Sequence, residues 1–407
     1  MSFFIFVRGN WPFLLAGFLF SLTSSYGQTF FISIFAGRIM TDFALTDGQW
    51  GMTYTVATTL SAILMVWGGA LTDVMRSRTL SLIVMLGLAA TCVAMFLNTS
   101  ALVLVAVVLF LRFFGQGMCN HLAIVSMARW YVGNRGKALS IAGMGVALGT
   151  AALPVIFAAA MEVVPWRILW LISAAIIVLT IPFIQLLLRK ERTPQSMAKE
   201  TQATGMDNRH WTRSEVVTHP VFWLLLPALM GPPAWGTALF FQQVHLSEVK
   251  DWSLVGFTAL FPLLAVVSVA SSLVSGAVID RVGGWRILPF FSVPSIALFI
   301  IMAQATTLVG AAVAIVLLGV GQGLMATLPG AFWSEFYGTR HIGSIKAAAG
   351  AAMVFGTAIG PGVSGCLIDL GIDVPAQMYC IAVYFLVAGV LAIWAVRMAA
   401  PRLPVSA

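Results

Sequence analysis

The sequence predicts an all-α integral membrane protein with twelve transmembrane helices in two pseudo-symmetric six-helix bundles. Of its 407 residues, 60% are hydrophobic and 9% are charged, whereas soluble domains carry about 25% charged residues. The apolar runs are long and continuous, which favours helices over the alternating pattern of a membrane β-barrel. An internal repeat, described below, divides these helices into two related sets.

Composition also excludes several classes of function. The net charge is +8, but most Lys and Arg lie in alternate loops, which indicates membrane topology and not nucleic-acid binding. The sequence contains no nucleotide-binding loop and no clustered nucleophile and base. It therefore predicts neither an enzyme nor a cofactor. The spacing of its four cysteines predicts no metal site; these are Cys92, Cys119, Cys366 and Cys380.

Twelve apolar spans can be drawn, each long enough for the roughly 20 residues that a membrane-crossing helix needs. The first is too long, and lacks the small-residue cleavage site, for a removable signal peptide. An even number of spans places both termini on one side of the membrane. The expected spans are 11–37, 48–72, 79–97, 101–130, 137–160, 166–188, 219–246, 253–278, 284–304, 307–335, 345–369 and 374–396.

The loops between these spans predict the orientation. Most basic residues lie in loops on the side of the termini, and the opposite loops hold only Arg38, Arg167 and Lys250. Because positively charged loops stay in the cytoplasm, we expect a multi-pass protein of the cytoplasmic (inner) membrane with both termini cytoplasmic.

One long polar segment, Arg189–Thr218, separates the sixth span from the seventh. Its charged residues, Gln and Thr predict a cytoplasmic linker, with a short interfacial helix near Trp211. The expected domains are therefore an N-terminal bundle (1–188), a linker (189–218) and a C-terminal bundle (219–407).

The two halves of the sequence repeat each other. Residues 69–73 (GALTD) match residues 276–280 (GAVID) at an offset of 207. Gly115-Gln116-Gly117 matches Gly321-Gln322-Gly323 at an offset of 206. Gly149, Thr150 and Pro154 match Gly356, Thr357 and Pro361, again at 207. Repeats of this kind are typical of transporters built from two related halves.

These motifs resemble those of the major facilitator superfamily over nearly the whole chain. GALTDVMRSR resembles the family's loop between spans two and three, and GAVIDRVGGWR resembles the second copy of that loop. LRFFGQG resembles the fourth-span motif, and GTAALP and GTAIGPGVSG resemble the motif of spans five and eleven. The resemblance implies alternating access between two rocking bundles. SSYGQTFF and the overall layout most resemble bacterial monocarboxylate and oxalate–formate-type transporters, although the charged residue those often carry in span eight is absent.

Arg112 is the first candidate site residue. It lies about a dozen residues into the fourth span, roughly 16 Å from the outer end and near the bilayer midplane. A guanidinium there costs at least about 2.5–3.5 kcal/mol, so it should face a cavity or a partner. No Asp or Glu lies deep in another predicted span. We interpret Arg112 as an anion receptor; alternatively it braces backbone carbonyls or serves a relay role that the family motif implies.

The neighbours of Arg112 follow from ideal helix geometry. Gln116 would lie about 40° from Arg112, and Cys119 and Ala123 about 20°, on one stripe. His121 would lie on the opposite face. The second repeat has Leu318 in place of the arginine, so an asymmetric site for a monoanion is expected.

Spans one and seven supply the remaining candidates. Tyr26-Gly27 aligns with Trp235-Gly236, and the polar first span should face the cavity or another helix. Gly231-Pro232-Pro233 should break span seven into a hinge. We expect substrate contacts from Tyr26, Gln28, Trp235 and Gln242, with aromatic packing and interhelical hydrogen bonds as the alternatives.

A cytoplasmic gate is expected at the loop after the second span. An Asp at a span end can accept hydrogen bonds from a neighbouring helix N-terminus, and the resemblance implies a latch made by Asp73, Arg76 and Arg78. Asp280 and Arg281 would form a weaker latch in the second half. Glu335 and Arg129 end matching spans, and an ion pair between them is a further possibility.

The sequence thus predicts a secondary transporter that moves a small organic anion by proton symport or anion exchange. Its expected partners are that small-molecule substrate, protons and the lipid bilayer, and a monomer is expected. The alternative is an exporter of drugs or amphipathic metabolites driven by proton antiport, although such a pocket usually needs a buried carboxylate.

Overall fold

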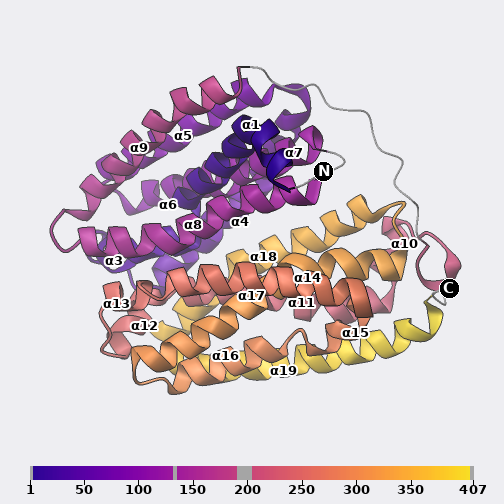
Figure 1. Cartoon of the computed structure of the whole chain (residues 1–407). Coiled ribbons are helices and arrows are strands. Elements are labelled where there is room, and N and C mark those ends of the chain that lie inside the picture. The colour runs from indigo at the N-terminus through magenta and orange to yellow at the C-terminus, as the bar shows by residue number, and fades with distance from the viewer. Residues whose placement is uncertain (1–2, 132–134, 190–203, 404–407) are drawn as a thin grey trace. The chain divides into compact units, whose positions relative to one another are not determined.

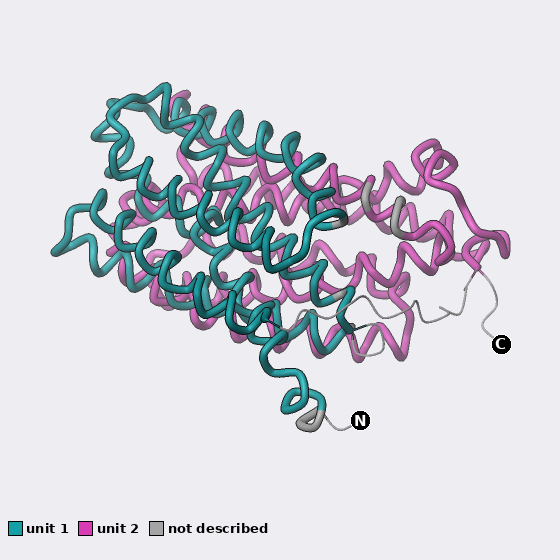
Figure 2. Tube along the Cα trace, turned by 90° about the horizontal axis from the view of Figure 1, so that it is seen from above, with its two compact units in different colours: residues 1–199 teal, residues 200–407 magenta. Residues whose placement is uncertain are grey.

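The structure is a computed structural model that describes residues 3–131, 135–189 and 204–403. Its regular elements are all helices, as the sequence predicts, and no strand occurs in these ranges (Figure 1). The chain forms two compact units, residues 1–199 and 200–407 (Figure 2).

The first unit contains the helices that carry most of the repeat's first copy. They are α1 (Phe3–Ser24), η1 (Ser25–Gly27), α2 (Thr29–Ile32), η2 (Ser33–Phe35), α3 (Ala36–Phe43), α4 (Asp47–Val74), α5 (Ser77–Leu97), α6 (Ala101–Phe110), η3 (Leu111–Cys119), α7 (Asn120–Trp130), α8 (Arg135–Ala160) and α9 (Trp166–Leu187).

The second unit repeats this arrangement with its own interruptions. Its elements are η5 (Met206–Asn208), α10 (Arg213–Thr218), α11 (Pro220–Phe241), α12 (Gln243–Val249), α13 (Leu254–Thr258), α14 (Phe261–Val282), α15 (Gly284–Ile287), η6 (Leu288–Phe290), α16 (Val293–Gln304), α17 (Leu308–Tyr337), α18 (Ile342–Asp369), α19 (Val374–Ala399) and η7 (Ala400–Arg402).

Eleven helical segments of the described chain are long and apolar enough to cross a membrane. Helix α1, with 22 residues, is not among them; it carries Arg8 and Asn10 near its start. Together with α1 they correspond to the twelve spans that the sequence predicts. The first predicted span is not one continuous helix, because it turns through η1, α2 and η2 after Ser24.

Glycines bring two equivalent helix pairs into backbone contact. Helix α1 packs against α8 in the first unit, and α11 packs against α18 in the second. A Cβ on Gly145 would lie 2.2 Å from the carbonyl oxygen of Phe18, and a Cβ on Gly360 would lie 2.1 Å from that of Ala234. Both distances are shorter than any real Cβ contact, so each crossing requires glycine.

Residues 204–218, expected as part of the linker, pack onto the second unit. Met206, Trp211 and Val216 are buried in its core with residues of α11, α17 and α19. The backbone N–H of Trp211 donates to the carbonyl of Tyr337 at 3.1 Å. A short helix, α10, does follow Trp211, and the indole is covered by protein. Residues 190–203 of the expected linker lie outside the described ranges.

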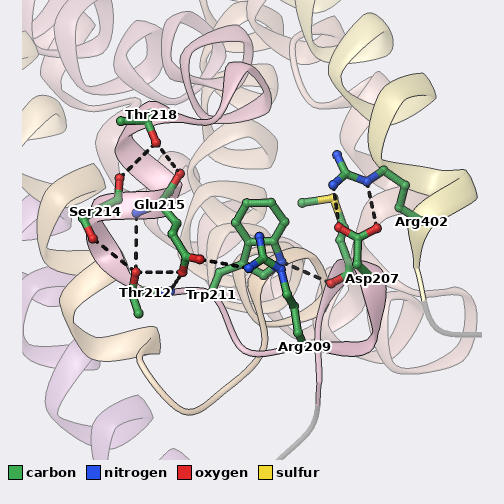
Figure 3. Close-up of polar contacts among 9 residues, drawn as sticks. Asp207, Arg209, Trp211, Thr212, Ser214, Glu215, Thr218 and Arg402 are labelled. Atoms are coloured by element: carbon green, nitrogen blue, oxygen red, sulfur yellow. Dashed lines mark hydrogen bonds and ion pairs between the residues drawn. The ribbon is translucent and has the colours of Figure 1, made fainter.

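A polar cluster fastens this segment to the end of the last helix (Figure 3). The guanidinium of Arg402 forms two hydrogen bonds with the carboxylate of Asp207, the one from Nε measuring 3.0 Å. Arg209 donates to Glu215 at 2.9 Å, and its Cζ lies 4.0 Å from the ring centroid of Trp211. We call Asp207, Arg209, Trp211, Glu215 and Arg402 the clasp.

Candidate functional site

Arg112 lies on η3 and is enclosed by other residues of the first unit, with 1% of its surface exposed. Its Nη1 donates to the carbonyl oxygen of Gly27 at 3.1 Å and to Oγ1 of Thr29 at 3.4 Å. Its Cζ lies 5.2 Å from the ring centroid of Tyr54 on α4. The contact with the Gly27 carbonyl matches the alternative considered from the sequence, in which Arg112 braces a backbone carbonyl. This contact uses Nη1 of the guanidinium.

The helix that carries Arg112 is not an α-helix. Leu111–Cys119 is a π-helix, whose hydrogen bonds run from i to i+5 and which often occurs at functional sites. The expected stripe at 100° per residue is therefore wrong here. Cys119 and Ala123 are fully buried core residues. Gln116 is half-buried, and no hydrogen bond joins it to Arg112 in the described chain.

Two glycines fix η1 against this π-helix. A Cβ on Gly27 would lie 2.1 Å from the carbonyl oxygen of Leu111. A Cβ on Gly115 would lie 2.6 Å from Cα of Gly27. Since neither position tolerates a side chain without movement, the two backbones touch, and the Gly27 carbonyl is placed beside Arg112.

The charge of Arg112 has no acidic partner in the described part of the chain. Among residues whose burial is described, it is the one charged side chain that is buried. Its Nε is buried and has no hydrogen-bond acceptor there. Buried donors in native proteins are nearly always satisfied by protein, water or a ligand, so this N–H is a candidate position for a ligand.

The two other first-unit candidates differ from one another. Tyr26 is buried, and its ring packs edge-on against Phe31 at 5.2 Å and Phe157 at 6.5 Å between centroids. This is the packing role that the sequence left open for aromatics. Gln28 links η1 to α2 in an extended conformation, and its side chain is half-buried. Neither side chain is bonded to Arg112 in the described chain.

The second unit holds the other two predicted contact residues. Trp235 on α11 packs edge-on against Tyr384 with 5.9 Å between ring centroids, and its Nε1 is buried without an acceptor. Gln242 follows the end of α11 and is 3% exposed, and its Nε2 also lacks an acceptor in the described chain. Both side chains therefore retain an unused N–H donor.

The seventh span is not broken at its prolines, so the expected break there is wrong. Helix α11 continues through Gly231-Pro232-Pro233 to Phe241 and ends at Gln242. Proline removes two backbone donors there, but its fixed φ is compatible with a helix. The hydroxyl of Tyr384 donates to the carbonyl of Pro227 at 2.7 Å, which satisfies one acceptor near the prolines.

The predicted gate residues are mostly exposed. The side chain of Asp73 lies outside the described part of the structure. Arg76 is exposed just before α5, and the Nε of exposed Arg78 donates to Gln185 at 3.2 Å. Asp280 and Arg281, at the end of α14, are also exposed.

In the second unit the acid that caps a neighbouring helix is Glu335. Its carboxylate accepts from the backbone N–H groups of Gly284 at 2.7 Å and Trp285 at 2.9 Å. These N–H groups are free because they begin α15. The guanidinium of Arg129, in the first unit, donates to the carbonyl of Thr72. Glu335 thus binds backbone groups of its own unit, and the ion pair with Arg129 stays a prediction.

Tyr54 is not among the residues predicted from the sequence. Its hydroxyl lies 2.5 Å from Oγ1 of Thr29, and its side chain is fully buried. The sequence feature that could have identified Tyr54 is the polarity of the second span. Its apolar run is interrupted by Thr53, Tyr54, Thr55, Thr58 and Thr59.

A family model described as Major Facilitator Superfamily matches residues 14–361. The chain is similar to a bacterial homologue of the human lysosomal transporter Spinster, inward-facing and unoccupied, at 16% identity and a TM-score of 0.73, over 97% of this chain and 98% of that one. The occupied inward-facing form matches at 16% and 0.71, with the same coverage. A mutant of the nucleoside transporter NupG matches at 14% and 0.71, over 94% of this chain and 98% of that one. No curated protein matches.

Proposed function

Because the chain belongs to the Major Facilitator Superfamily, and is thus a multi-pass membrane transporter of small molecules, we propose that its substrate is a small organic anion of the monocarboxylate type. The proposed mechanism is alternating access between an N-terminal bundle (1–188) and a C-terminal bundle (219–407). The proposed location is the inner membrane, with both termini in the cytoplasm and a monomer as the working unit.

One observation carries this proposal. Three of the six predicted contact residues each keep a buried N–H without an acceptor in the described chain: Arg112 through Nε, Trp235 through Nε1 and Gln242 through Nε2. Leaving such a donor unsatisfied costs about 1–3 kcal/mol. A ligand that supplies an acceptor to any one of these groups would recover this free energy, and a carboxylate supplies acceptors only.

The geometry of Arg112 supports a planar carboxylate in particular. Both of its hydrogen bonds to protein come from Nη1, so the edge that includes Nε is the edge left for a ligand. A guanidinium binds carboxylates through two parallel N–H bonds. Because Arg112 is enclosed in this conformation, substrate must reach it in another state of the transport cycle.

The charge inventory also limits the coupling mechanism. No Asp or Glu is buried among the residues whose burial is described. A proton would then cross on the substrate itself or on a histidine, or one anion would exchange for another. The alternative of a proton-driven exporter of drugs or amphipathic metabolites lacks the buried carboxylate that such a pocket needs, so the anion transporter is favoured.

Transport assays in proteoliposomes, with a thermal-shift screen of the purified chain, test this proposal. The screen compares acetate, lactate and benzoate with nucleosides and hydrophobic amines. We expect stabilisation by a carboxylate, because ligands that bind the native state raise its melting temperature. Arg112→Lys should lose most carboxylate uptake, because lysine is a point charge without a planar fork. Uptake at the wild-type rate in Arg112→Lys, or stabilisation by amines alone, would contradict the proposal.

A further inference from the structure

Tyr54 contacts the arginine site in two ways. Its ring lies beside the guanidinium, with 5.2 Å between the ring centroid and Cζ of Arg112. Its hydroxyl lies 2.5 Å from Oγ1 of Thr29, and that oxygen is 3.4 Å from Nη1 of Arg112. One side chain from α4 therefore contacts both the guanidinium and one of the two acceptors that bind it.

The hydrogen-bond directions follow from the groups involved. A guanidinium has donors only, so Oγ1 of Thr29 accepts from Arg112. The remaining hydrogen between Thr29 and Tyr54 belongs to either hydroxyl. In both cases the contact with Tyr54 holds Oγ1 of Thr29 on the side of the arginine, and both side chains are buried.

This chain of contacts determines which way the guanidinium faces. The carbonyl of Gly27 and the hydroxyl of Thr29 hold Nη1 at one corner of a planar group. The edge with the unpartnered Nε then has a fixed direction. Two parallel N–H bonds to a carboxylate form only if that edge lies in the plane of the ligand.

We propose that Tyr54 is a positioning residue that acts through Thr29 to orient Arg112 for a planar carboxylate. The inference rests on the function proposed above, and it adds a specificity determinant in a span that supplies none of the predicted contacts. Tyr54 itself need not touch the substrate. Its contribution is to keep the arginine from rotating away from the bidentate arrangement.

The experiment removes the hydroxyl and keeps the ring. Tyr54→Phe should raise the half-saturating concentration of the most stabilising of acetate, lactate and benzoate about tenfold, since hydrogen bonds in networks with charged groups are worth about one such factor. The maximal uptake rate in proteoliposomes should change less than about twofold. Thr29→Ser, which keeps the hydroxyl, should retain wild-type affinity, and Thr29→Val should reproduce the loss.

Tyr131→Phe is the matched control. Tyr131 is another buried tyrosine of the first unit, and its hydroxyl donates to the carbonyl of Asn10 at 3.4 Å. The variant Tyr131→Phe should lower the melting temperature of the ligand-free protein as much as Tyr54→Phe does, without changing carboxylate affinity. The double variant Tyr54→Phe/Thr29→Val should bind no more weakly than Thr29→Val alone, because Thr29→Val already removes the contact that Tyr54 makes with Thr29.

Each result decides between the two proposals. If Tyr54→Phe and Thr29→Val keep wild-type affinity, or if their losses add in the double variant, the positioning role is wrong and the transport proposal stands. If the wild-type protein is stabilised by no carboxylate, both are wrong. Should Tyr54→Phe not fold, the comparison of Thr29→Val with Thr29→Ser decides the inference alone.

Discussion

Two arginines of this chain have opposite surroundings. Arg112 is buried in the first unit, where it contacts a backbone carbonyl, a hydroxyl and an aromatic ring. Arg402 is exposed in the second unit, where its guanidinium is paired with the carboxylate of Asp207 and with a ring nitrogen of His219. The buried arginine thus lacks an acidic partner in the described chain, and the exposed arginine has one.

This difference separates a structural role from a functional one. Exposed ion pairs contribute little to stability, typically about 0–1 kcal/mol. In the clasp the charge of Arg402 is already paired with Asp207, so no ligand is needed to explain this arginine. A buried charge without a counter-ion is costly, because no partner charge offsets its desolvation. We therefore expect substitutions at the two arginines to separate transport from stability.

The largest effect is expected at Arg112. Arg112→Met should reduce carboxylate uptake at least about 30-fold, because losing one partner of a buried, hydrogen-bonded charge pair costs about 2–5 kcal/mol. The melting temperature of the ligand-free protein should stay the same or rise. Arg402→Met is the matched variant, with uptake within about twofold of wild type. If Arg112→Met and Arg402→Met lose uptake equally, the assignment of a functional role to Arg112 and a structural role to Arg402 is wrong.

The second effect concerns the glycine that places the Gly27 carbonyl beside Arg112. Gly27→Ala would force a Cβ to 2.1 Å from the carbonyl oxygen of Leu111, whereas nothing lies within 4 Å of a Cβ at Gly236. Gly27→Ala should therefore destabilise the protein by about 1–3 kcal/mol, as overpacking does. Gly236→Ala, at the matching position of the repeat, should be nearly neutral. Thermal unfolding in detergent measures both, and similar stabilities would show that the contact relaxes easily.

The smallest effect is a pH dependence of the clasp. His219 accepts from Arg402 at 3.2 Å through Nε2, and its Nδ1 lies 3.1 Å from the hydroxyl of Tyr337. The accepting nitrogen must be unprotonated, since Arg402 only donates. Burial, followed by the Arg402 charge, lowers the pKa of His219 from 6.5, and nearby Asp207 opposes this while Arg209 adds to it.

The sign follows from proton linkage. Between the lowered pKa and 6.5 the unfolded chain binds more protons at His219 than the folded chain. The clasp should therefore be fully stable above that range and weaken as the pH falls through it. Hydrogen exchange of residues 204–218 measures this, and His219→Gln should remove the dependence. The pKa of Asp207 is lowered by its hydrogen bond with Arg402, so its contribution is lost only below 3.8. If hydrogen exchange in His219→Gln depends on pH as it does in the wild type, another group causes the effect.

Much of the fold follows from patterns within single spans. Continuous apolar runs and the repeat predict the helices, and a charge inside such a run predicts that Arg112 faces a cavity or a partner. In this conformation it is enclosed and has protein partners, Gly27 and Thr29. The surroundings of Arg112 depend on contacts between segments that are distant in the sequence. Patterns within a single span carry no information about such contacts. The π-helix at Leu111–Cys119 changes the angular spacing that the prediction of a shared face with Gln116 assumed.

The errors have similar causes. The backbone contact between Gly27 and Gly115 joins two spans, and the role of Tyr54 depends on a third. The proline pair lies within a continuous α11, because the fixed φ of proline is compatible with a helix. Trp211 is buried because residues 204–218 fold onto the second unit, although their composition is that of a linker.

The glycine contacts of α1 with α8 and of α11 with α18 have a mechanical consequence. Where two main chains touch directly, no layer of side chains remains that could be compressed or could change rotamer to let the helices slide. Such a crossing resists sliding of one helix along the other. Each of the two helix pairs, one in each half of the polypeptide, should therefore move as a rigid body. Motion during the work of the protein would then be concentrated in segments that lack this contact.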